Sequence, residues 1–366
     1  MISNTFGDKF KISLSGGSHE EKVSVSIMGV PPGIVLCADD FKEALVRRNP
    51  KGQAFTERKE TDVPIFEKGL VPTLSDIAAK DSVIDNIATE GITTGNELVI
   101  SFFNKNVRDE DYSKFADIPR PGHADFTSRI KYGKNFNGGG MFSGRMTVGI
   151  VAAGVVAMKC LQNAFSKMAE VTAINSIFNI NAEISSVEQL NRTDFTDEES
   201  FDLAVAHLIN LLKQEGDSAG GIITCIINGV PAGLGEPFFN SMESLLSHMI
   251  FSIPGVRGIE FGDGFKSSAM RGSEHNDSIV DRQGKTSKNG AGGINGGITN
   301  GNPIKFNVAF KPTSSISCIQ KSYNFSKNKV ESFMIKGRHD VCFALRCPII
   351  VESAVAIVMA NMADIL

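Results

Sequence analysis

The chain of 366 residues contains no tryptophan, and it has three tyrosines against 25 phenylalanines. It also lacks an excess of charge of one sign, since the formal net charge is −4. A protein that binds duplex nucleic acid usually presents a strongly basic surface, so this class is disfavoured. With 42% apolar and 21% charged residues, the composition is that of a folded globular protein and excludes intrinsic disorder.

The six cysteines are scattered and form neither a C-x-x-C pair nor a Cys/His cluster at zinc spacing. Scattered thiols of this kind indicate a reducing compartment, so we expect the cytoplasm. No apolar run approaches about 18 residues without a polar or charged residue, so no membrane span is expected. The first residues lack a charged segment followed by an apolar one, which predicts that there is no signal peptide.

Several familiar active-site motifs are also missing. The sequence has no G-x-x-x-x-G-K-[S/T] phosphate loop and no G-x-G-x-x-G in a strand-helix-strand unit. It has no G-x-S-x-G elbow and no H-E-x-x-H helix. The common signals of nucleotide-binding proteins, serine hydrolases and zinc proteases are therefore absent.

Hydrophobic periodicity predicts a mixture of strands and helices. Strands are expected at residues 11–14, 22–28, 98–103, 220–227, 258–261 and 304–310. Helices are expected at residues 41–48, 143–167, 202–214, 241–250 and 348–363. Small residues in the second of these helices (VGIVAAGVVA) favour close packing at the centre of the fold.

Glycine is abundant, at 36 residues, where about 7% is usual. Such an excess suggests positive backbone φ angles or close approach to a ligand. The glycine-rich stretch 263–302 is too long for an ordinary loop, so it is either disordered or functional. GVPPG at 29–33 and GVPAG at 229–233 each follow a predicted strand. This echo marks two similar halves, or it reflects chance and shared turn chemistry.

Three histidines lie in glycine-containing turns beside polar or charged residues: His19, His123 and His339. Histidine titrates near neutral pH and is suited to proton transfer. The alternative for each is a hydrogen-bonded residue of a surface turn. The other three histidines have no such neighbours, and we interpret them as structural.

Arginines beside helix ends and Gly/Pro turns suggest an anionic ligand, because guanidinium groups bind phosphate and carboxylate in pairs of hydrogen bonds. The alternative for each is a solvated surface charge. Ser143 could cap the long helix or place an anion at its N-terminus. The segment KPTSS at 311–315 offers one ammonium and three hydroxyls. Taken together, these residues favour an enzyme that binds a multiply charged anion and uses histidine as an acid. The arginines concerned are Arg48, Arg120, Arg145 and Arg338.

Several longer segments together resemble the chorismate synthase family. They are RPGHADFTSRIKYG (120–133), EGDSAGG and GVPAGLGEPFF (within 215–239), GIEFGDGF (258–265), KPTSSIS (311–317) and GRHDVCFALRCPIIVE (337–352). The match runs through nearly the whole chain, and RPGHAD together with GRHD is highly specific.

The resemblance implies an α+β fold, a β-α-β sandwich with a pseudo-repeated core, in a single domain spanning 1–366. It implies the 1,4-elimination of phosphate from 5-enolpyruvylshikimate 3-phosphate to give chorismate, with reduced FMN (FMNH2) as cofactor. This reaction ends the common part of aromatic amino acid biosynthesis. It further implies a homotetramer without nucleic-acid or membrane partners. Whether NADPH serves as the reductant stays open.

Matched position by position, the resemblance implies roles for individual residues. His19 would protonate the departing phosphate, His123 would protonate the reduced flavin, and Asp340 would help to remove the C6 proton. Substrate anions would be held by Arg48, Arg120, Arg145 and Arg338. Flavin-contacting positions would be Ser143, Gly296, Lys311, Thr313, Ser314, Ser315 and Arg338.

The chain also departs from the family pattern. Gly17 and Glu20 flank His19 where the family has glutamate and glycine, and Ala54 and Met141 stand where arginines are expected. Pro254-Gly255 replaces Asn-Ala or Gln-Ala, and there is extra sequence at 68–92. We therefore expect a divergent but active enzyme. The alternatives are a paralogous flavin enzyme with another anionic substrate, or a non-catalytic homologue.

Overall fold

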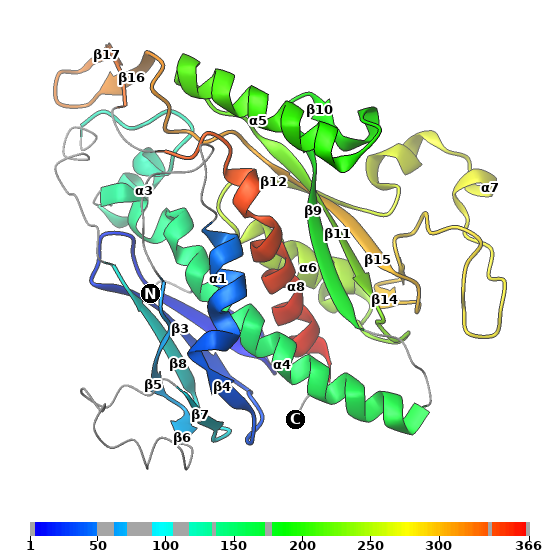
Figure 1. Cartoon of the computed structure of the whole chain (residues 1–366). Helices are drawn as coiled ribbons and strands as arrows, with labels where there is room; N and C mark the ends of the chain where they lie inside the picture. Colours follow the sequence, from blue (N-terminus) through cyan, green and yellow to red (C-terminus); the bar gives the residue numbers. More distant parts are fainter. Residues whose placement is uncertain are drawn as a thin grey trace.

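The computed structural model describes residues 4–49, 62–71, 90–104, 117–133, 137–172, 178–335 and 339–363. Two antiparallel five-stranded sheets enclose a layer of helices (Figure 1). The strand order is β1-β2-β3-β8-β5 in the first sheet and β10-β9-β11-β15-β12 in the second. The expected α+β class and β-α-β sandwich are confirmed.

Buried and more exposed residues alternate along the central strands of the second sheet, as the hydrophobic pattern of the sequence predicts. The first sheet contains β1 (Thr5–Phe6), β2 (Lys11–Gly16), β3 (Lys22–Met28), β8 (Leu98–Phe103) and β5 (Ile65–Lys68). The second contains β10 (Leu190–Asn191), β9 (Asn179–Val187), β11 (Gly221–Asn228), β15 (Ile304–Phe310) and β12 (Val256–Phe261). Smaller sheets are formed by β4 (Val35–Cys37), β7 (Glu90–Thr93) and β6 (Leu70–Val71), by β13 (Ile294–Asn295) and β14 (Ile298–Thr299), and by β16 (Gln320–Asn324) and β17 (Lys329–Phe333).

The described helices are α1 (Lys42–Arg48), α3 (Asp125–Tyr132), α4 (Thr147–Thr172), α5 (Glu198–Glu215), α6 (Met242–Phe251), α7 (Gly272–His275) and α8 (Pro348–Met362). Short 3-10 turns, η5 (Gly144–Met146) and η9 (Phe343–Arg346), precede α4 and α8. The long helix, expected at roughly 143–167, is α4 preceded directly by η5, and the expected capping role of Ser143 is confirmed for that turn. The Ser143 hydroxyl accepts a hydrogen bond from the backbone N–H of Arg145 and so caps η5, and α4 begins after that turn.

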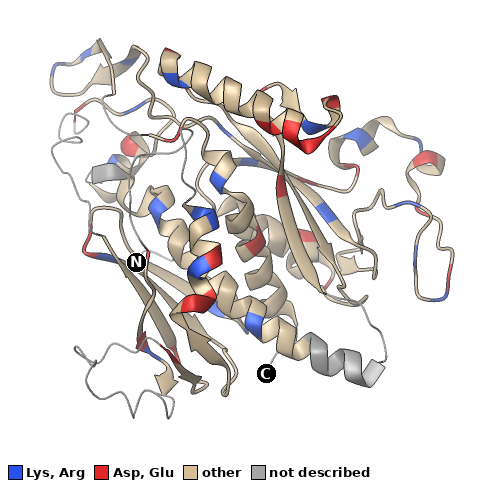
Figure 2. Ribbon diagram, viewed as in Figure 1, with Lys and Arg blue, Asp and Glu red and all other residues tan. Residues whose placement is uncertain are grey.

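Helices α4 and α8 form the centre of the sandwich. α4 packs on β3 and β8, α8 packs on β9 and β11, and the two helices pack on each other. Residues 349–360 of α8 are all buried, and Figure 2 shows this helix almost free of charged residues. At the crossing, a β-carbon on Gly154 would lie 2.3 Å from the Cβ of Ser353. Close packing of the small-residue helix is thereby confirmed.

One segment, Gly144–Ala164, has the length and hydropathy of a membrane span. In its most apolar window, however, 78% of the residues are buried inside the protein. Apolar residues in this segment are accounted for by packing between the two sheets, as in the core helix of a globular protein.

The GVPPG/GVPAG echo corresponds to the same turn in both halves. Thr93 Oγ1 donates to the carbonyl of Pro31 at 2.6 Å and accepts from Ile34 N at 2.9 Å. Thr299 Oγ1 donates to the carbonyl of Pro231 at 2.7 Å and accepts from Leu234 N at 2.9 Å. The last glycine of each pentapeptide has a positive φ, 90° in GVPPG and 105° in GVPAG. The echo therefore marks two similar halves.

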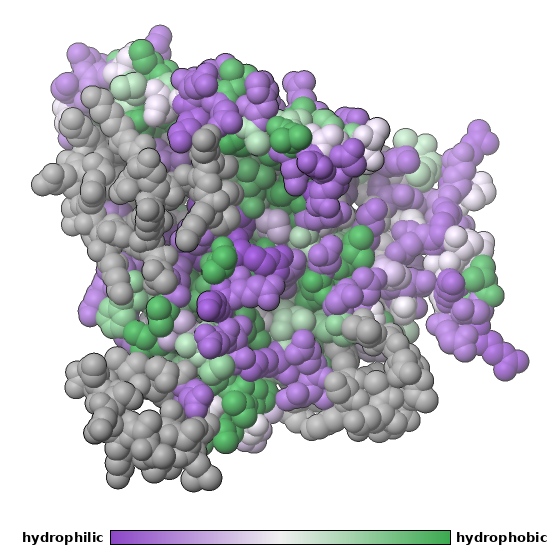
Figure 3. Space-filling model, in the orientation of Figure 1, coloured by the Kyte–Doolittle hydropathy of each residue, from purple (hydrophilic) through white to green (hydrophobic). Residues whose placement is uncertain are grey.

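The glycine-rich stretch 263–302 is ordered, so the disordered alternative is excluded. Asp277 accepts hydrogen bonds from the backbone N–H groups of Gly290 and Ala291, both at 2.9 Å. The stretch forms an arm that carries α7 and extends from the second sheet (Figure 1). Hydrophilic residues cover most of this arm on the face that Figure 3 shows.

Candidate active site

A cavity of about 800 Å³ opens near the N-terminal ends of α4 and α8. Its volume falls in the range of about 300–1,000 Å³ that is common for small-molecule sites. Both halves contribute to the wall. The lining segments lie within 48–49 at the end of α1, 120–127, 141–145 before α4, 251–257 after α6, 311–315 after β15 and 339–346 before α8.

The cavity brings together most of the residues predicted from the sequence: Arg48, Arg120, His123, Ser143, Arg145, Lys311, Thr313, Ser314, Ser315 and Asp340. Two predicted residues, His19 and Gly296, are not among its lining residues. Gly296 lies in the β13–β14 hairpin with a φ of 62°. Arg338 and Ala54 lie outside the described residues.

Arg48 and Arg145 share one buried carboxylate. Arg48 Nη2 donates to Asp62 Oδ2 at 2.6 Å, and Arg145 Nη1 donates to Asp62 Oδ1 at 2.5 Å. Neither arginine side chain is more than 5% exposed. Burial acts to raise the pKa of Asp62, but the two guanidinium groups outweigh it and hold that pKa below its usual value. An ionised Asp62 therefore orients both arginines at the cavity wall.

This arginine cluster still favours an additional anion. Burial lowers the pKa of Arg48; the Asp62 carboxylate opposes that shift, while the charges of Arg145 and Arg346 add to it. Arg48 Nε is buried and has no hydrogen-bond partner among the residues that the structure describes. A bound phosphate or carboxylate would supply both the acceptor and the opposing charge.

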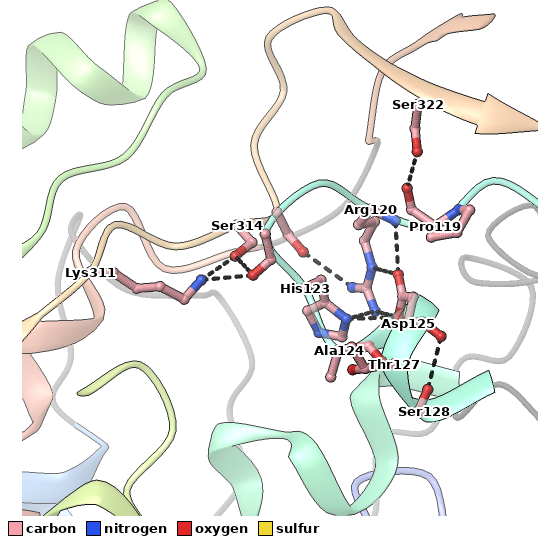
Figure 4. Close-up of polar contacts among 12 residues, drawn as sticks. Pro119, Arg120, His123, Ala124, Asp125, Thr127, Ser128, Lys311, Ser314 and Ser322 are labelled. Atoms are coloured by element: carbon pink, nitrogen blue, oxygen red, sulfur yellow. Dashed lines mark hydrogen bonds and ion pairs between the residues drawn. The ribbon is translucent and has the colours of Figure 1, made fainter. Parts of the chain in front are cut away.

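A second network holds the RPGHAD turn together (Figure 4). Asp125 Oδ2 accepts from Arg120 Nε at 2.7 Å, and Asp125 Oδ1 accepts from Arg120 Nη2 at 2.8 Å. His123 Nδ1 lies 2.7 Å from Asp125 Oδ1. Burial acts to raise the pKa of Asp125, but hydrogen bonds from Arg120 and His123 hold it well below its ordinary value. Asp125 is thus an anion that orients a cation and an imidazole together.

The carboxylate also selects the nitrogen that His123 presents to a ligand. A ring that donates from Nδ1 to Asp125 leaves Nε2 for other partners. The backbone of Gly139 lies beside Nε2, since a β-carbon on this glycine would be 3.5 Å from that nitrogen. His123 is therefore held in an orientation in which Nε2 can exchange a proton with a bound molecule.

Lys311 and Ser314 join the end of β15 to the same turn. Lys311 Nζ donates to the carbonyl of Gly122 at 3.0 Å and also hydrogen-bonds Ser314 Oγ, which donates to that carbonyl at 2.7 Å. Burial lowers the pKa of Lys311, and the nearby charge of Arg257 lowers it further. Thr313 Oγ1 is buried without a hydrogen-bond partner in the described part of the chain. This corner suits polar groups of a bound ligand.

His19 lies on the turn beside the glycine run that leads to the cavity. Its Nδ1 is 3.1 Å from the hydroxyl of Ser18, and Ser18 N donates to the carbonyl of Gly140 at 3.2 Å. The turn therefore packs against the backbone immediately before Met141, which lines the cavity. His19 therefore lies on a turn that contacts the backbone next to the cavity wall, but its side chain does not line the cavity.

The structure adds polar residues that the sequence patterns did not single out. Asp62 belongs to none of the motifs and periodic segments identified in the sequence. Asp125 lies inside the RPGHAD motif, so that motif was the available signal. Arg257 and Arg346 line the cavity, and Arg346 Nη2 donates to Asp340 Oδ1 at 2.6 Å. Its position just before the last helix was the one hint.

Comparisons with known proteins agree with this geometry. The family model described as chorismate synthase matches residues 10–363. A chorismate synthase from Chitinophaga pinensis is 42% identical over 360 residues, covering 98% of this chain and 96% of the relative. One from Pyrococcus abyssi is 38% identical over 362 residues, covering 97% of this chain and 96% of the relative. The chain belongs to the chorismate synthase family.

A solved chorismate synthase structure has the same fold, with a TM-score of 0.67 and 21% identity, over 98% of this chain and 92% of that one. The chain's function is accordingly that of a chorismate synthase, a lyase of the shikimate pathway. Nothing in these relatives favours the paralogue or the non-catalytic homologue.

The departures from the chorismate synthase pattern can now be placed. A β-carbon on Gly17 would lie 3.3 Å from the carbonyl carbon of Gly140, so the family's glutamate would crowd that backbone. Glu20 is exposed. Met141 and the Pro254-Gly255 pair line the cavity itself. Met141 and Pro254-Gly255 therefore bring two of these departures directly into the cavity wall.

Proposed function

We propose that this chain converts 5-enolpyruvylshikimate 3-phosphate into chorismate within the cavity described above. The observation that carries the proposal is the gathering of Arg48, Arg120, Arg145 and Lys311 around one cavity, in a chain of this family. The substrate has a phosphate and two carboxylates, and arginine forks suit both groups.

In the proposed reaction the C6–H and C3–O bonds of the substrate break. The electrons of the C6–H bond become part of the new ring double bond system, and phosphate leaves with the electrons of the C3–O bond. Arginines that are held in place before the reaction stabilise the departing anion without having to reorganise. His19 is assigned to protonating that phosphate, and Asp340 to removing the C6 proton.

The cavity also fits a second anionic ligand, the cofactor. Bound reduced FMN supplies electron density to the electron-poor transition state, with no net redox change. Ser143, Lys311 and Thr313 offer donors to its polar groups, and Ser314, whose O–H donates to Gly122, offers its oxygen. The Thr313 hydroxyl, which has no partner among the described residues, supports this fit. Ser315 Oγ accepts from Arg120 Nη1 at 3.1 Å, which leaves its O–H to donate to a polar group of the cofactor. Gly296 and Arg338 are assigned to the flavin by resemblance.

His123 is the proposed proton donor to reduced flavin. When Nδ1–H donates to Asp125, the ring can give a proton from Nε2 only as the imidazolium, whose positive charge the Asp125 carboxylate would stabilise. Asp125 and Arg120 both contact Nδ1 of the ring, which supports an orientation with Nε2 toward the ligand. The turn thus couples an anion-binding arginine to a proton donor.

The wider assignments follow the family. We infer a homotetramer in the cytoplasm, with the flavin supplied in reduced form or reduced by NADPH. All six cysteines are free thiols, which agrees with a reducing compartment. The loss of arginine at Ala54 weighs slightly against reduction by NADPH on the enzyme.

The test is an anaerobic assay of the purified protein with 5-enolpyruvylshikimate 3-phosphate and chemically reduced FMN. Chorismate and one equivalent of phosphate are expected, and oxidised FMN serves as the control. Absence of chorismate at high enzyme concentration would overturn the proposal. Titration with FMN then separates a flavin-binding protein with another substrate from a preparation that binds nothing.

A further inference from the structure

Arg145 and Arg346 occupy matching places in the two halves of the molecule. Each lies two residues before the central helix of its half, since α4 begins at Thr147 and α8 at Pro348. Each belongs to a 3-10 turn, is 8% exposed and lines the cavity. The sequence resemblance assigned Arg145 to the substrate and assigned nothing to Arg346.

The two arginines also have matching partners. Arg145 pairs with Asp62, and Arg346 Nη2 donates to Asp340 Oδ1 at 2.6 Å. The side chains of Arg346 and Asp340 are 10% and 12% exposed. The difference lies in the carboxylates: Asp62 also binds Arg48, whereas Asp340 itself lines the cavity. The first pair presents a cation to the ligand and the second presents an anion.

We propose that Arg346 is a positioning residue that keeps Asp340 ionised and aimed at the substrate. This inference rests on the proposed function, in which Asp340 accepts a proton. A carboxylate in a site with little solvent resists ionisation unless a cation accompanies it. Arg346 supplies that cation at hydrogen-bond distance.

Arg48, two cysteines and His339 are the other described groups that lie near this pair. Arg48, from α1, is close enough for its charge to interact with that of Arg346, but its own carboxylate partner is Asp62. Burial raises the pKa of Cys342 to about 11 and that of Cys347 well above its usual value, so both thiols are neutral. His339, next to Asp340 in the chain, also lines the cavity.

The kinetic test compares R346Q and R346K with the matched variant R145Q. We expect R346Q to lower kcat on the order of tenfold or more with little change in the KM of the phosphate ester. R145Q should mainly raise that KM. In R346Q the acid limb of the kcat profile should move to higher pH by about 1 unit or more, since an opposite charge at this distance shifts a carboxyl pKa by roughly 1–3 units. R346K keeps the charge and should retain the wild-type acid limb.

A double-mutant cycle with D340N gives the second measurement. If Arg346 acts through Asp340, R346Q causes little further loss of kcat in the D340N background. An equal loss in both backgrounds, or an effect of R346Q on KM alone, would overturn the proposal. So would an R346K enzyme whose acid limb moves as far as that of R346Q. Thermal unfolding shows which variants fold, and R346K takes the place of R346Q in the cycle if R346Q does not.

A readout without turnover separates this inference from the proposed function. Carbon-13 NMR of labelled aspartate follows the protonation of Asp340 in the cofactor-free protein. Asp340 should protonate at higher pH in R346Q than in wild type, and an unchanged titration contradicts the pairing. If wild type makes no chorismate, the proposed function fails while this titration still decides the pair.

Discussion

The two halves of the molecule share a common frame, a five-stranded sheet packed on a central helix, but contribute different side chains to the cavity. Strands β2, β3, β8 and β5 correspond in sheet position and in chain order to β9, β11, β15 and β12, whereas the edge strand precedes its neighbour in the first half (β1) and follows it in the second (β10). The last pair of each sheet carries a register shift, opposite the start of β8 in one half and opposite the end of β15 in the other. The proline turn with its threonine is repeated bond for bond. Duplication of the frame therefore reaches individual hydrogen bonds.

The difference lies where the halves meet at the cavity. The first half provides His123, Arg48 and Arg120 to the cavity wall. The second half provides the KPTSS segment and Asp340. The arginines before α4 and α8 are common to both. A symmetric frame thus carries an asymmetric site, which a single asymmetric substrate requires.

The largest effect is expected from the histidines of the first half. His123→Ala and His19→Ala should each lower turnover on the order of tenfold or more, because a positioned acid is lost. Anaerobic assays with reduced FMN measure the effect. His275→Ala, on the exposed arm of the second half, is the matched control and should stay close to wild type. Wild-type rates in H123A and H19A would remove their proposed roles.

Asp125→Asn tests whether that acid depends on its carboxylate. Turnover should fall on the order of tenfold, since the ring loses the anion that sets its orientation. Stability should fall by about 1.5–3 kcal/mol at pH 7, the usual cost of losing hydrogen bonds to a charged group. Urea unfolding and turnover, measured on the same preparation, provide both numbers.

The stability difference should also depend on pH. The folded-state pKa of Asp125 lies below its usual value, so its ion pairs stabilise the protein above the unfolded pKa of about 4. That contribution is lost as the pH falls through the lower folded value. The gap between wild type and D125N should therefore be full at pH 7 and should shrink in acid. A gap that stays constant down to the acid transition contradicts this account.

Thr93→Val and Thr299→Val test the equivalence of the two halves. Each threonine is 3% exposed. Each substitution leaves one backbone donor and one acceptor of the turn without its partner, at a cost of about 1–3 kcal/mol. Denaturant unfolding should show similar losses for the two variants and little change in turnover. Clearly unequal losses would show that the repeated turn has diverged in importance.

The smallest effect is expected from Met141→Arg, which restores the family's residue in the cavity wall. If no other group supplies the missing charge, FMN or the phosphate ester should bind a few-fold to tenfold more tightly, corresponding to about 1 kcal/mol. Titration calorimetry measures both ligands, and Met141→Gln controls for the change in shape. Unchanged or weaker binding would mean that other cations, such as Arg257, already take this role.

Much of the frame and part of the site could be predicted from sequence. The strands at 22–28 and 98–103 are confirmed residue for residue, because alternation along a half-buried strand is a local property. RPGHAD and KPTSS predicted cavity residues that the structure brings together. Asp62 could not be predicted, because its role depends on two arginines that reach it from other elements.

Two neighbouring arginines, Arg47 and Arg48, show most clearly what the sequence pattern could not predict. Arg47 binds Glu352 through both terminal nitrogens, at 2.7 and 2.8 Å, and Glu352 also accepts from Ala182 N at 3.0 Å. This pair joins the two halves through α1, α8 and β9. Arg48, the next residue, faces the cavity instead. Their positions at the end of one predicted helix do not tell which arginine binds a carboxylate of the other half and which lines the cavity.

The sequence by itself determined the family and much of the strand pattern, because these follow from local periodicity and from motifs that are continuous in the chain. The GVPPG/GVPAG echo alone left open whether the two halves are similar. Only the tertiary structure decided which charged residues join the two halves and which line the cavity. The physical reason is that the state of a buried charge depends on its partners, and here those partners lie far away in sequence. Asp62 with Arg145, and Arg47 with Glu352, meet only once the sandwich has formed.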